Sequence, residues 1–265
     1  MSSTSPTRSD GGLLLRYDIA GPRYTSYPTA PQFRPDFGEA QYREHARCSN
    51  ATFTPRPLSL YVHIPFCASP CFYCGCSRLI TRDTAAGSRY VERLLREAAL
   101  VAPLFDHHRE VRQLHLGGGT PNFLRQTDLS RLIEALAGNF RLGAAGSLDF
   151  SIELDPRFAT AADVEHLGRL GFNRASLGVQ DFDPRVQEAV NRIQSVEQTL
   201  GIIEACREAG FRSINIDLIY GLPHQSLEGF GRTLDTIIAA RPDRLAVYGY
   251  AHMPRLFKAQ RRIDA

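Results

Sequence analysis

The chain has 265 residues, of which 43% are hydrophobic and 22% are charged, and its formal net charge is +3. A chain of this length can bury one sizeable core, and the nearly balanced charge excludes a bulk attraction to nucleic acid or to a membrane surface. No run of about 18 apolar residues marks a membrane span, and the opening residues MSSTSPTRSDGG lack the hydrophobic segment of a signal peptide. We therefore expect a monomeric cytoplasmic protein with neither a nucleic-acid nor a membrane partner.

The N-terminal part has the composition of an irregular segment. Residues 1–12 are rich in Ser, Thr, Gly and Asp, and we expect them to be disordered. Residues 13–57 are expected to form an arm and a linker, because the segment GPRYTSYPTAPQFRPDF (21–37) is too rich in proline for a regular element. A short polar helix follows this segment, before the first predicted strand.

Strands and helices alternate in the hydrophobic pattern from residue 58 onward. Short apolar and β-branched segments predict strands, and longer segments with apolar residues at helical spacing predict the helices between them. The expected strands are LSLYVHIPF (58–66), VRQLHL (111–116), LDFSIEL (148–154), RASLGVQ (174–180), SINIDLIYG (213–221) and RLAVYGYA (244–251). The expected helices begin near Ser88, Thr127, Ala161, Asp183 and Leu227, with Thr127 as the N-cap of its helix.

Six consecutive β/α units over residues 58–255 predict an α/β fold. A closed or incomplete barrel fits this pattern better than a sandwich, although a doubly wound open sheet uses the same local pattern. Several of the strands are too apolar to leave one face exposed to water, as is expected of parallel strands covered by helices. In either fold the functional residues belong at the carboxyl ends of the strands, so the cysteine loop after the first strand and the GGGT segment after the second should share one edge.

The segment HIPFCASPCFYCGCSR concentrates cysteines at the spacing CxxxCxxCxC. In a reducing cytosol such a cluster binds metal or performs redox chemistry more often than it forms disulfides. A zinc site commonly uses two separated ligand pairs, and a second pair is missing here. The spacing favours an iron–sulfur cluster, with zinc and redox-active thiols as the alternatives. Cys206 lies apart on the apolar face of a predicted helix and is expected to be a packing residue.

The motif CxxxCxxC after a first strand resembles that of the radical S-adenosylmethionine (SAM) superfamily. Within it, the segments GPRYTSYPTA, YVHIPFCASPCFYCGC, HLGGGTP, SIELDP, GVQDF and NIDLIYGLP are similar to those of the oxygen-independent coproporphyrinogen III oxidases, or coproporphyrinogen dehydrogenases. The resemblance implies a partial (β/α)6 radical SAM barrel with an irregular N-terminal arm. It also implies a 4Fe–4S cluster on Cys67, Cys71 and Cys74, whose fourth iron binds SAM.

The resemblance further implies a reaction and its partners. Members of this family convert two propionate side chains of coproporphyrinogen III into vinyl groups by radical oxidative decarboxylation, which gives protoporphyrinogen IX for haem biosynthesis. A low-potential electron donor and an electron acceptor are implied as well. The alternative is the related haem chaperone branch, which binds and delivers haem. That branch usually has Phe in place of Cys76 and lacks the GPRYTSYPTA arm, so both features favour the dehydrogenase.

Individual roles follow by matching the motifs. Gly118, Gly119 and Thr120 match the loop that receives SAM, and Glu153 matches a ribose ligand, for which we expect a buried carboxylate. The resemblance implies two SAM molecules, contacted also by Tyr61, Tyr73, Gln180, Arg192, Asp217 and Ala251, with Arg192 pairing with a SAM carboxylate. Cys76 matches a catalytic cysteine that is not a cluster ligand. Read without the resemblance, these positions are a strand-exit turn, a capping carboxylate, core aromatics and a surface arginine.

The family continues into a further C-terminal domain. The resemblance therefore leads us to expect that residues 256–265 begin a region that is otherwise missing from this chain.

Overall fold

The computed structural model describes residues 11–17, 32–144 and 146–263. The chain divides into two compact units, Met1–Cys48 and Ser49–Ala265, and each is considered by itself. Helix α1 (Gly11–Tyr17) belongs to the first unit, and helix α2 (Glu39–Asn50) is the expected short polar helix. Gly11 and Gly12 are helical, which differs from the expected disorder to residue 12. Residues 1–10 and the part of the expected arm at 21–31 lie outside the described residues.

The second unit is built on a parallel sheet whose main strands follow the order of the chain. These strands are β1 (Leu58–Ile64), β4 (Glu110–Gly118), β6 (Asp149–Leu154), β7 (Arg174–Gln180), β8 (Ser213–Tyr220) and β9 (Arg244–Gly249). A doubly wound sheet would reverse its strand order near the middle, and this sheet does not. In the described sheet β1 and β9 are the two ends of the path, so the fold is an incomplete barrel. The predicted partial (β/α)6 barrel is confirmed.

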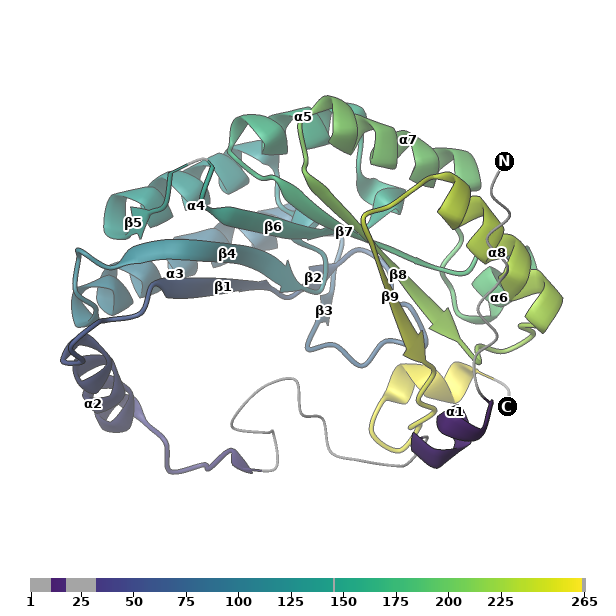
Figure 1. Cartoon of the computed structure of the whole chain (residues 1–265), viewed down its shortest axis with the longest axis horizontal. Helices are drawn as coiled ribbons and strands as arrows, with labels where there is room; N and C mark the ends of the chain where they lie inside the picture. The colour runs from purple at the N-terminus through teal and green to yellow at the C-terminus, as the bar shows by residue number, and fades with distance from the viewer. Residues whose placement is uncertain (1–10, 18–31, 145, 264–265) are drawn as a thin grey trace. The chain divides into compact units, whose positions relative to one another are not determined.

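Helical crossovers lie along the outer face of the curved sheet (Figure 1). They are α3 (Thr84–Val101), α4 (Gln126–Asn139), α5 (Ala161–Arg169), α7 (Val196–Glu208) and α8 (Leu227–Ala239). The short helix α6 (Pro184–Ala189) instead packs its buried Val186 in a separate cluster with Leu222 and Ile263. Shorter elements complete the unit: β2 (Phe66–Cys67), β3 (Leu79–Ile80), β5 (Arg141–Leu142), η2 (Ala102–Leu104), η3 (Pro121–Phe123), η4 (Pro156–Phe158) and η5 (Lys258–Arg262). In the described residues after β9 only η5 is helical.

Side-chain caps fix where several helices begin. Asp83 accepts a hydrogen bond from the Ala85 amide and starts α3 before the expected Ser88. Thr160 forms a reciprocal capping box with Asp163 at the start of α5. The prediction for α4 is wrong, because its N-cap is Arg125, which makes no side-chain cap, and Thr127 lies inside the helix.

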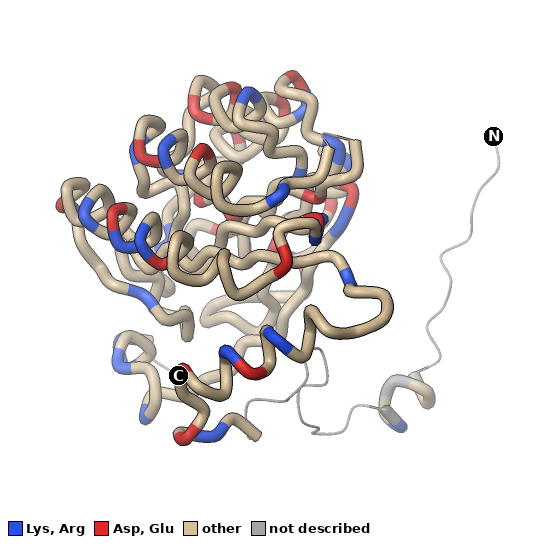
Figure 2. The backbone as a smooth tube through the Cα atoms, turned by 90° about the vertical axis from the view of Figure 1, so that its left-hand side faces the viewer, with Lys and Arg blue, Asp and Glu red and all other residues tan. Residues whose placement is uncertain are grey.

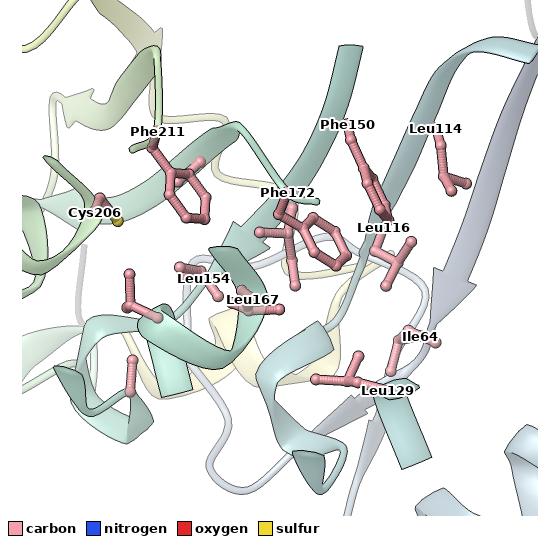
Figure 3. Close-up of a cluster of buried hydrophobic side chains, with 14 of the residues drawn as sticks. Ile64, Leu114, Leu116, Leu129, Phe150, Leu154, Leu167, Phe172, Cys206 and Phe211 are labelled. Carbon is pink, nitrogen blue, oxygen red and sulfur yellow. The ribbon is translucent and has the colours of Figure 1, made fainter. Parts of the chain in front are cut away.

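Alternation along the strands separates an apolar outer face from a polar inner face. In β6, Phe150, Ile152 and Leu154 are buried, whereas the intervening Ser151 and Glu153 are partly exposed. Figure 3 shows the outer side chains packed between strands and helices, where Phe150 stacks on Phe172 with ring centroids 3.7 Å apart. The crossovers cover the outer face (Figure 1), as expected of parallel strands in a barrel. Cys206 lies in this core, as predicted.

Basic and acidic residues are interspersed along the outer helices (Figure 2), as a net charge of +3 leads one to expect. No described helix has the length and apolarity needed to cross a membrane. The prediction that neither nucleic acid nor a membrane is a partner stays a prediction.

Leu177→Ala should lower the free energy of unfolding by about 2–5 kcal/mol, because it removes a completely buried side chain from the outer face of β7. Urea unfolding followed by circular dichroism would measure this loss. The matched control is Leu227→Ala, since Leu227 is 97% exposed at the start of α8, and a change within about 0.5 kcal/mol is expected there. Equal losses in the two variants would contradict the assignment of the core to the outer face.

Candidate functional site

The cysteine loop follows the carboxyl end of β1, and two backbone hydrogen bonds close it. The Leu79 amide donates to the Pro65 carbonyl over 2.7 Å, and the Thr81 amide donates to the Cys67 carbonyl over 3.0 Å. Arg78 then binds the inside of the loop, donating from Nη1 to the Cys74 carbonyl over 2.7 Å and from Nη2 to the Cys71 carbonyl over 3.3 Å. The loop therefore has a fixed backbone around its thiols.

The far side of the loop is held by segments distant in the sequence. The Phe72 amide donates to the Val190 carbonyl over 2.9 Å, and Asn191 Nδ2 donates to the Pro70 carbonyl over 2.6 Å. Gln260 is almost completely buried, and its Nε2 donates both to the Tyr73 carbonyl over 3.0 Å and to the Ala251 carbonyl over 3.1 Å. One amide group thus joins two positions for which the sequence predicts SAM contacts.

The glycine loop lies directly against the start of the cysteine loop. The Gly119 amide donates to the Ile64 carbonyl over 2.8 Å, and a Cβ on Gly119 would lie 2.7 Å from the Pro65 carbonyl oxygen. Thr120 Oγ1 is 3.4 Å from the Cys67 sulfur. The close approach that requires glycine is therefore made by the protein's own backbone, in addition to any approach by a ligand.

Polar side chains from β6 and β8 reach the same edge of the sheet. Glu153 accepts a hydrogen bond from the Gly118 amide over 3.0 Å and lies 3.3 Å from His115 Nε2. Its side chain is 43% exposed, so the expectation of a buried carboxylate is wrong. Asp217 accepts from Ser176 Oγ over 3.0 Å and from Asn215 Nδ2 over 2.8 Å. Burial raises the pKa of Asp217 in spite of these hydrogen bonds.

A buried ionic group surrounds the Cys71 sulfur. Arg192 Nη1 lies 3.4 Å from Cys71 Sγ, and Arg157 Nη2 lies 3.3 Å from the same atom. Asp155 pairs with both arginines, at 2.6 Å from Arg157 and 3.3 Å from Arg192. Burial alone would raise the pKa of Asp155, but the charge of Arg192 and the hydrogen bond and charge of Arg157 outweigh burial and lower the pKa. We name Asp155, Arg157 and Arg192 the Asp155 triad.

The thiols of the loop differ in their electrostatic surroundings. A hydrogen bond with Cys76 is the main cause that lowers the pKa of Cys74 to about 6, and it correspondingly raises the pKa of Cys76. Burial raises the pKa of Cys67. The Cys76 amide also donates to the Cys74 sulfur over 3.4 Å. A ligand thiol must lose its proton to bind a metal, and the loop already favours that state at Cys74.

Many of these groups line one cleft. It brings together most of the predicted site residues, namely Cys67, Cys71, Tyr73, Cys74, Cys76, Gly118, Gly119, Thr120, Glu153, Gln180, Arg192 and Asp217. Gln180 lies at the end of β7 with a positive φ of 72°, which turns the chain at the cleft. Tyr61 and Ala251 are not among the lining residues. The Tyr61 hydroxyl instead lies 3.0 Å from His63 Nδ1, and the Tyr61 ring stacks on His115.

The sequence alone did not single out several residues of the cleft and its supports. The roles of Asp155, Arg157 and Arg78 depend on partners that they meet only in the folded chain. No local sequence pattern indicates that Gln260 supports the cysteine loop. The one available signal was the position of Asp155, which follows Glu153 closely at a strand end. Sequence reasoning therefore found the groups that line the cleft more readily than those that support them.

The spread of the sulfurs bears on the kind of metal group that the loop could hold. A tetrahedral zinc ion with Zn–S bonds of about 2.3 Å keeps its sulfur ligands about 3.8 Å apart. Among the described residues, three potential ligand atoms lie within 4.8 Å of one another only in the group Asp106, His107 and His108. These residues are exposed and lie 30 or more positions after Cys76, the last cysteine of the loop. No three of the loop thiols meet this limit together, so the donor set fits a larger group such as a cluster better than a single zinc ion.

Comparison with known proteins agrees with this chemistry. The model of the radical SAM superfamily matches residues 61–237. The chain belongs to the radical SAM superfamily. Membership in this superfamily implies a 4Fe–4S cluster and SAM as cofactors, and the site described above has the thiols and the cleft to accommodate them.

Individual radical SAM proteins show close similarity to the chain. The oxygen-independent coproporphyrinogen III oxidase of Pseudomonas aeruginosa is 50% identical over 258 residues, which cover 97% of this chain and 56% of the relative. That of Escherichia coli is 47% identical over 254 residues, or 96% of this chain and 54% of the relative. The solved structure of the Escherichia coli coproporphyrinogen III oxidase, described as a radical SAM enzyme, matches with a TM-score of 0.86 and 46% identity over 95% of this chain and 55% of that one. The chain spans about half the length of the curated relatives that it matches.

Gly119→Ala should destabilise the site, because the added methyl would meet the carbonyl oxygens of Pro65 and Phe66 at 2.7 and 2.8 Å. Displacing these strands should cost about 1–3 kcal/mol in urea unfolding. Gly201→Ala is the matched control, since Gly201 lies in α7 with no heavy atom within 4 Å of the new methyl, and a gain of up to about 1 kcal/mol is expected. A neutral Gly119→Ala variant would show that the contact does not hold the two loops.

Proposed function

We propose that the chain is the radical SAM barrel of an oxygen-independent coproporphyrinogen III oxidase. In this reaction two propionate side chains of coproporphyrinogen III each lose a hydrogen atom, one electron and carbon dioxide and become vinyl groups, which gives protoporphyrinogen IX. The observation that carries the proposal is the convergence of Cys67, Cys71 and Cys74 with the glycine loop in one cleft. The similarity to curated oxidases along almost the whole of this chain supports the choice of substrate. The relatives compared here give no support to the haem chaperone alternative.

In the proposed site three thiols hold a 4Fe–4S cluster and leave one iron for SAM. When bound, the cluster and SAM would supply the one-electron chemistry that removes a hydrogen atom from the β-carbon of a propionate. The chain's own residues orient the cofactors and exclude water. Arg78 and Gln260 fix the loop carbonyls around the thiols, and Thr120 contacts the Cys67 sulfur.

The polar groups of the cleft offer unused hydrogen-bonding capacity to SAM. Arg192 Nε is buried and has no hydrogen-bond partner in the described part of the chain, so a SAM carboxylate could accept from it. Glu153 uses one oxygen for the Gly118 amide and, being partly exposed, can accept from a ribose hydroxyl as well. We propose that Gly118, Gly119, Gln180 and Asp217 complete this SAM site, and that Tyr73 packs beside it.

Further parts of the proposal concern the neighbourhood of the cleft. Tyr61 and Ala251 lie outside the lining and would serve a second SAM molecule or the substrate. Cys76 is exposed at the cleft and is proposed to act in catalysis rather than as a cluster ligand. An external low-potential donor and an electron acceptor complete the reaction. We propose a monomer in the cytoplasm, where a reducing environment would preserve the cysteines.

Cys67→Ser, Cys71→Ser and Cys74→Ser should each abolish the cluster, because each leaves one iron without its thiolate. Iron and acid-labile sulfide would be measured after anaerobic reconstitution. Cys76→Ser is the matched control, since it alters a neighbouring thiol of the same loop, and it should retain the cluster while product formation falls. Equal loss of iron in all four variants would refute this division of roles.

The function itself is tested with the reconstituted chain, dithionite and SAM under anaerobic conditions. We expect an electron paramagnetic resonance signal of a reduced 4Fe–4S cluster that changes when SAM is added, followed by release of 5′-deoxyadenosine and formation of protoporphyrinogen IX from coproporphyrinogen III. Cleavage of SAM without any change in the porphyrinogen by the full-length protein that contains this chain would reject the substrate assignment. Tight haem binding without turnover would instead favour the haem-delivery function.

A further inference from the structure

The Cys71 sulfur is placed between two buried cations. The guanidinium groups of Arg157 and Arg192 lie 3.3 and 3.4 Å from it, and their side chains are only 10% and 7% exposed. The motif resemblance gave Arg192 a role towards SAM, but it gave Arg157 none. A buried arginine this close to a thiol requires an explanation, because burying a cation is costly unless it is paired.

Asp155 supplies that pairing but does not balance the charge. Its carboxylate contacts both arginines, and it also accepts a hydrogen bond from the Arg157 amide over 3.1 Å. The Asp155 triad therefore carries a net charge of +1 beside the sulfur when its members are ionised. Because the three side chains are at most 10% exposed, solvent screens this charge poorly.

Such a charge would act directly on the redox equilibrium of a cluster bound through Cys71. Adding one electron to an iron–sulfur cluster makes it more negative, and cations and N–H donors at the ligand sulfurs stabilise that state. Arginine stays protonated in proteins, so this influence does not depend on titration. An aspartate in the same group has the opposite effect on the reduced cluster.

We propose that the Asp155 triad sets the reduction potential of the cluster held by Cys71, with Arg157 raising the potential and Asp155 lowering it. The two side chains act through the sulfur and are positioning residues rather than catalytic ones. The proposal rests on the proposed function in one respect only, namely that Cys71 holds an iron–sulfur cluster. It is independent of which substrate the barrel acts on.

The triad predicts shifts of opposite sign for two nearly isosteric changes. Asp155→Asn raises the local net charge from +1 to +2 and should move the midpoint potential to a more positive value. Arg157→Gln lowers the local charge to zero and should move the midpoint to a more negative value. At a potential equal to the midpoint of the unaltered chain, we expect each change to alter the ratio of reduced to oxidised cluster at least tenfold. A tenfold change corresponds to a 59 mV shift of the midpoint potential for a one-electron couple.

The experiment is an anaerobic potentiometric titration of the reconstituted chain with dithionite, read by the electron paramagnetic resonance signal of the reduced cluster. Glu228→Gln and Arg232→Gln are the matched controls, because they change the same charges in an exposed ion pair on α8, and no shift is expected. Arg157→Lys keeps the charge but loses the forked donor, so its midpoint should lie between those of the unaltered chain and Arg157→Gln.

Each outcome decides between distinct possibilities. Opposite shifts with unchanged controls support the proposal, because a general loosening of the site would move both variants in one direction. Shifts of the same sign, or unchanged midpoints with full iron content, overturn it. If the triad variants lose the cluster while circular dichroism shows them folded, the triad serves assembly and the proposal is wrong. A missing cluster in the unaltered chain would instead reject the proposed function.

Discussion

The contact between the Gly119 backbone and the Pro65 carbonyl determines the arrangement of the site. A Cβ on Gly119 would lie 2.7 Å from that oxygen, and the same oxygen accepts the Leu79 amide that closes the cysteine loop. The successive carbonyls of Ile64 and Pro65 therefore hold the two loops, since one accepts the Gly119 amide and the other the Leu79 amide, and the Cys67 sulfur and the Thr120 hydroxyl lie 3.4 Å apart. Because backbone atoms make this contact, its geometry does not depend on side-chain rotamers. The thiols and the glycine loop consequently lie against each other at one edge of the sheet.

The outer face of the strands supplies stability, and the inner face supplies the polar groups of the site. Outward side chains such as Phe150 and Leu177 are buried beneath the helices and supply the hydrophobic stabilisation. Inward side chains such as Glu153 and Asp217 are polar and meet at the carboxyl edge, where their hydrogen bonds offset the cost of partial burial. The same alternation in the sequence thus produces both the core and the functional cleft.

Much of the fold was predictable from the sequence because it is encoded locally. The alternating segment LDFSIEL became strand β6, and RASLGVQ became β7 without a change of bounds. The order of the strands was not predictable from the residue pattern, because barrels and open sheets share the same local pattern. The motif resemblance supplied the positions that line the cleft but not their partners. Arg192 was expected to serve SAM, yet its contacts with Cys71 and Asp155 arise between residues far apart in the sequence. Arg157 and Gln260 escaped notice for the same reason.

Gln260 can support the cysteine loop only after the ribosome has translated most of the chain. It holds the Tyr73 carbonyl although it follows Tyr73 by 187 positions in the chain. At ribosomal rates of roughly 5–20 residues per second, the cysteines are made roughly 9–37 seconds before the amide that holds their loop. During this interval the nascent chain lacks the hydrogen bond that supports the cysteine loop. The loop can therefore reach its supported geometry only after translation has passed residue 260.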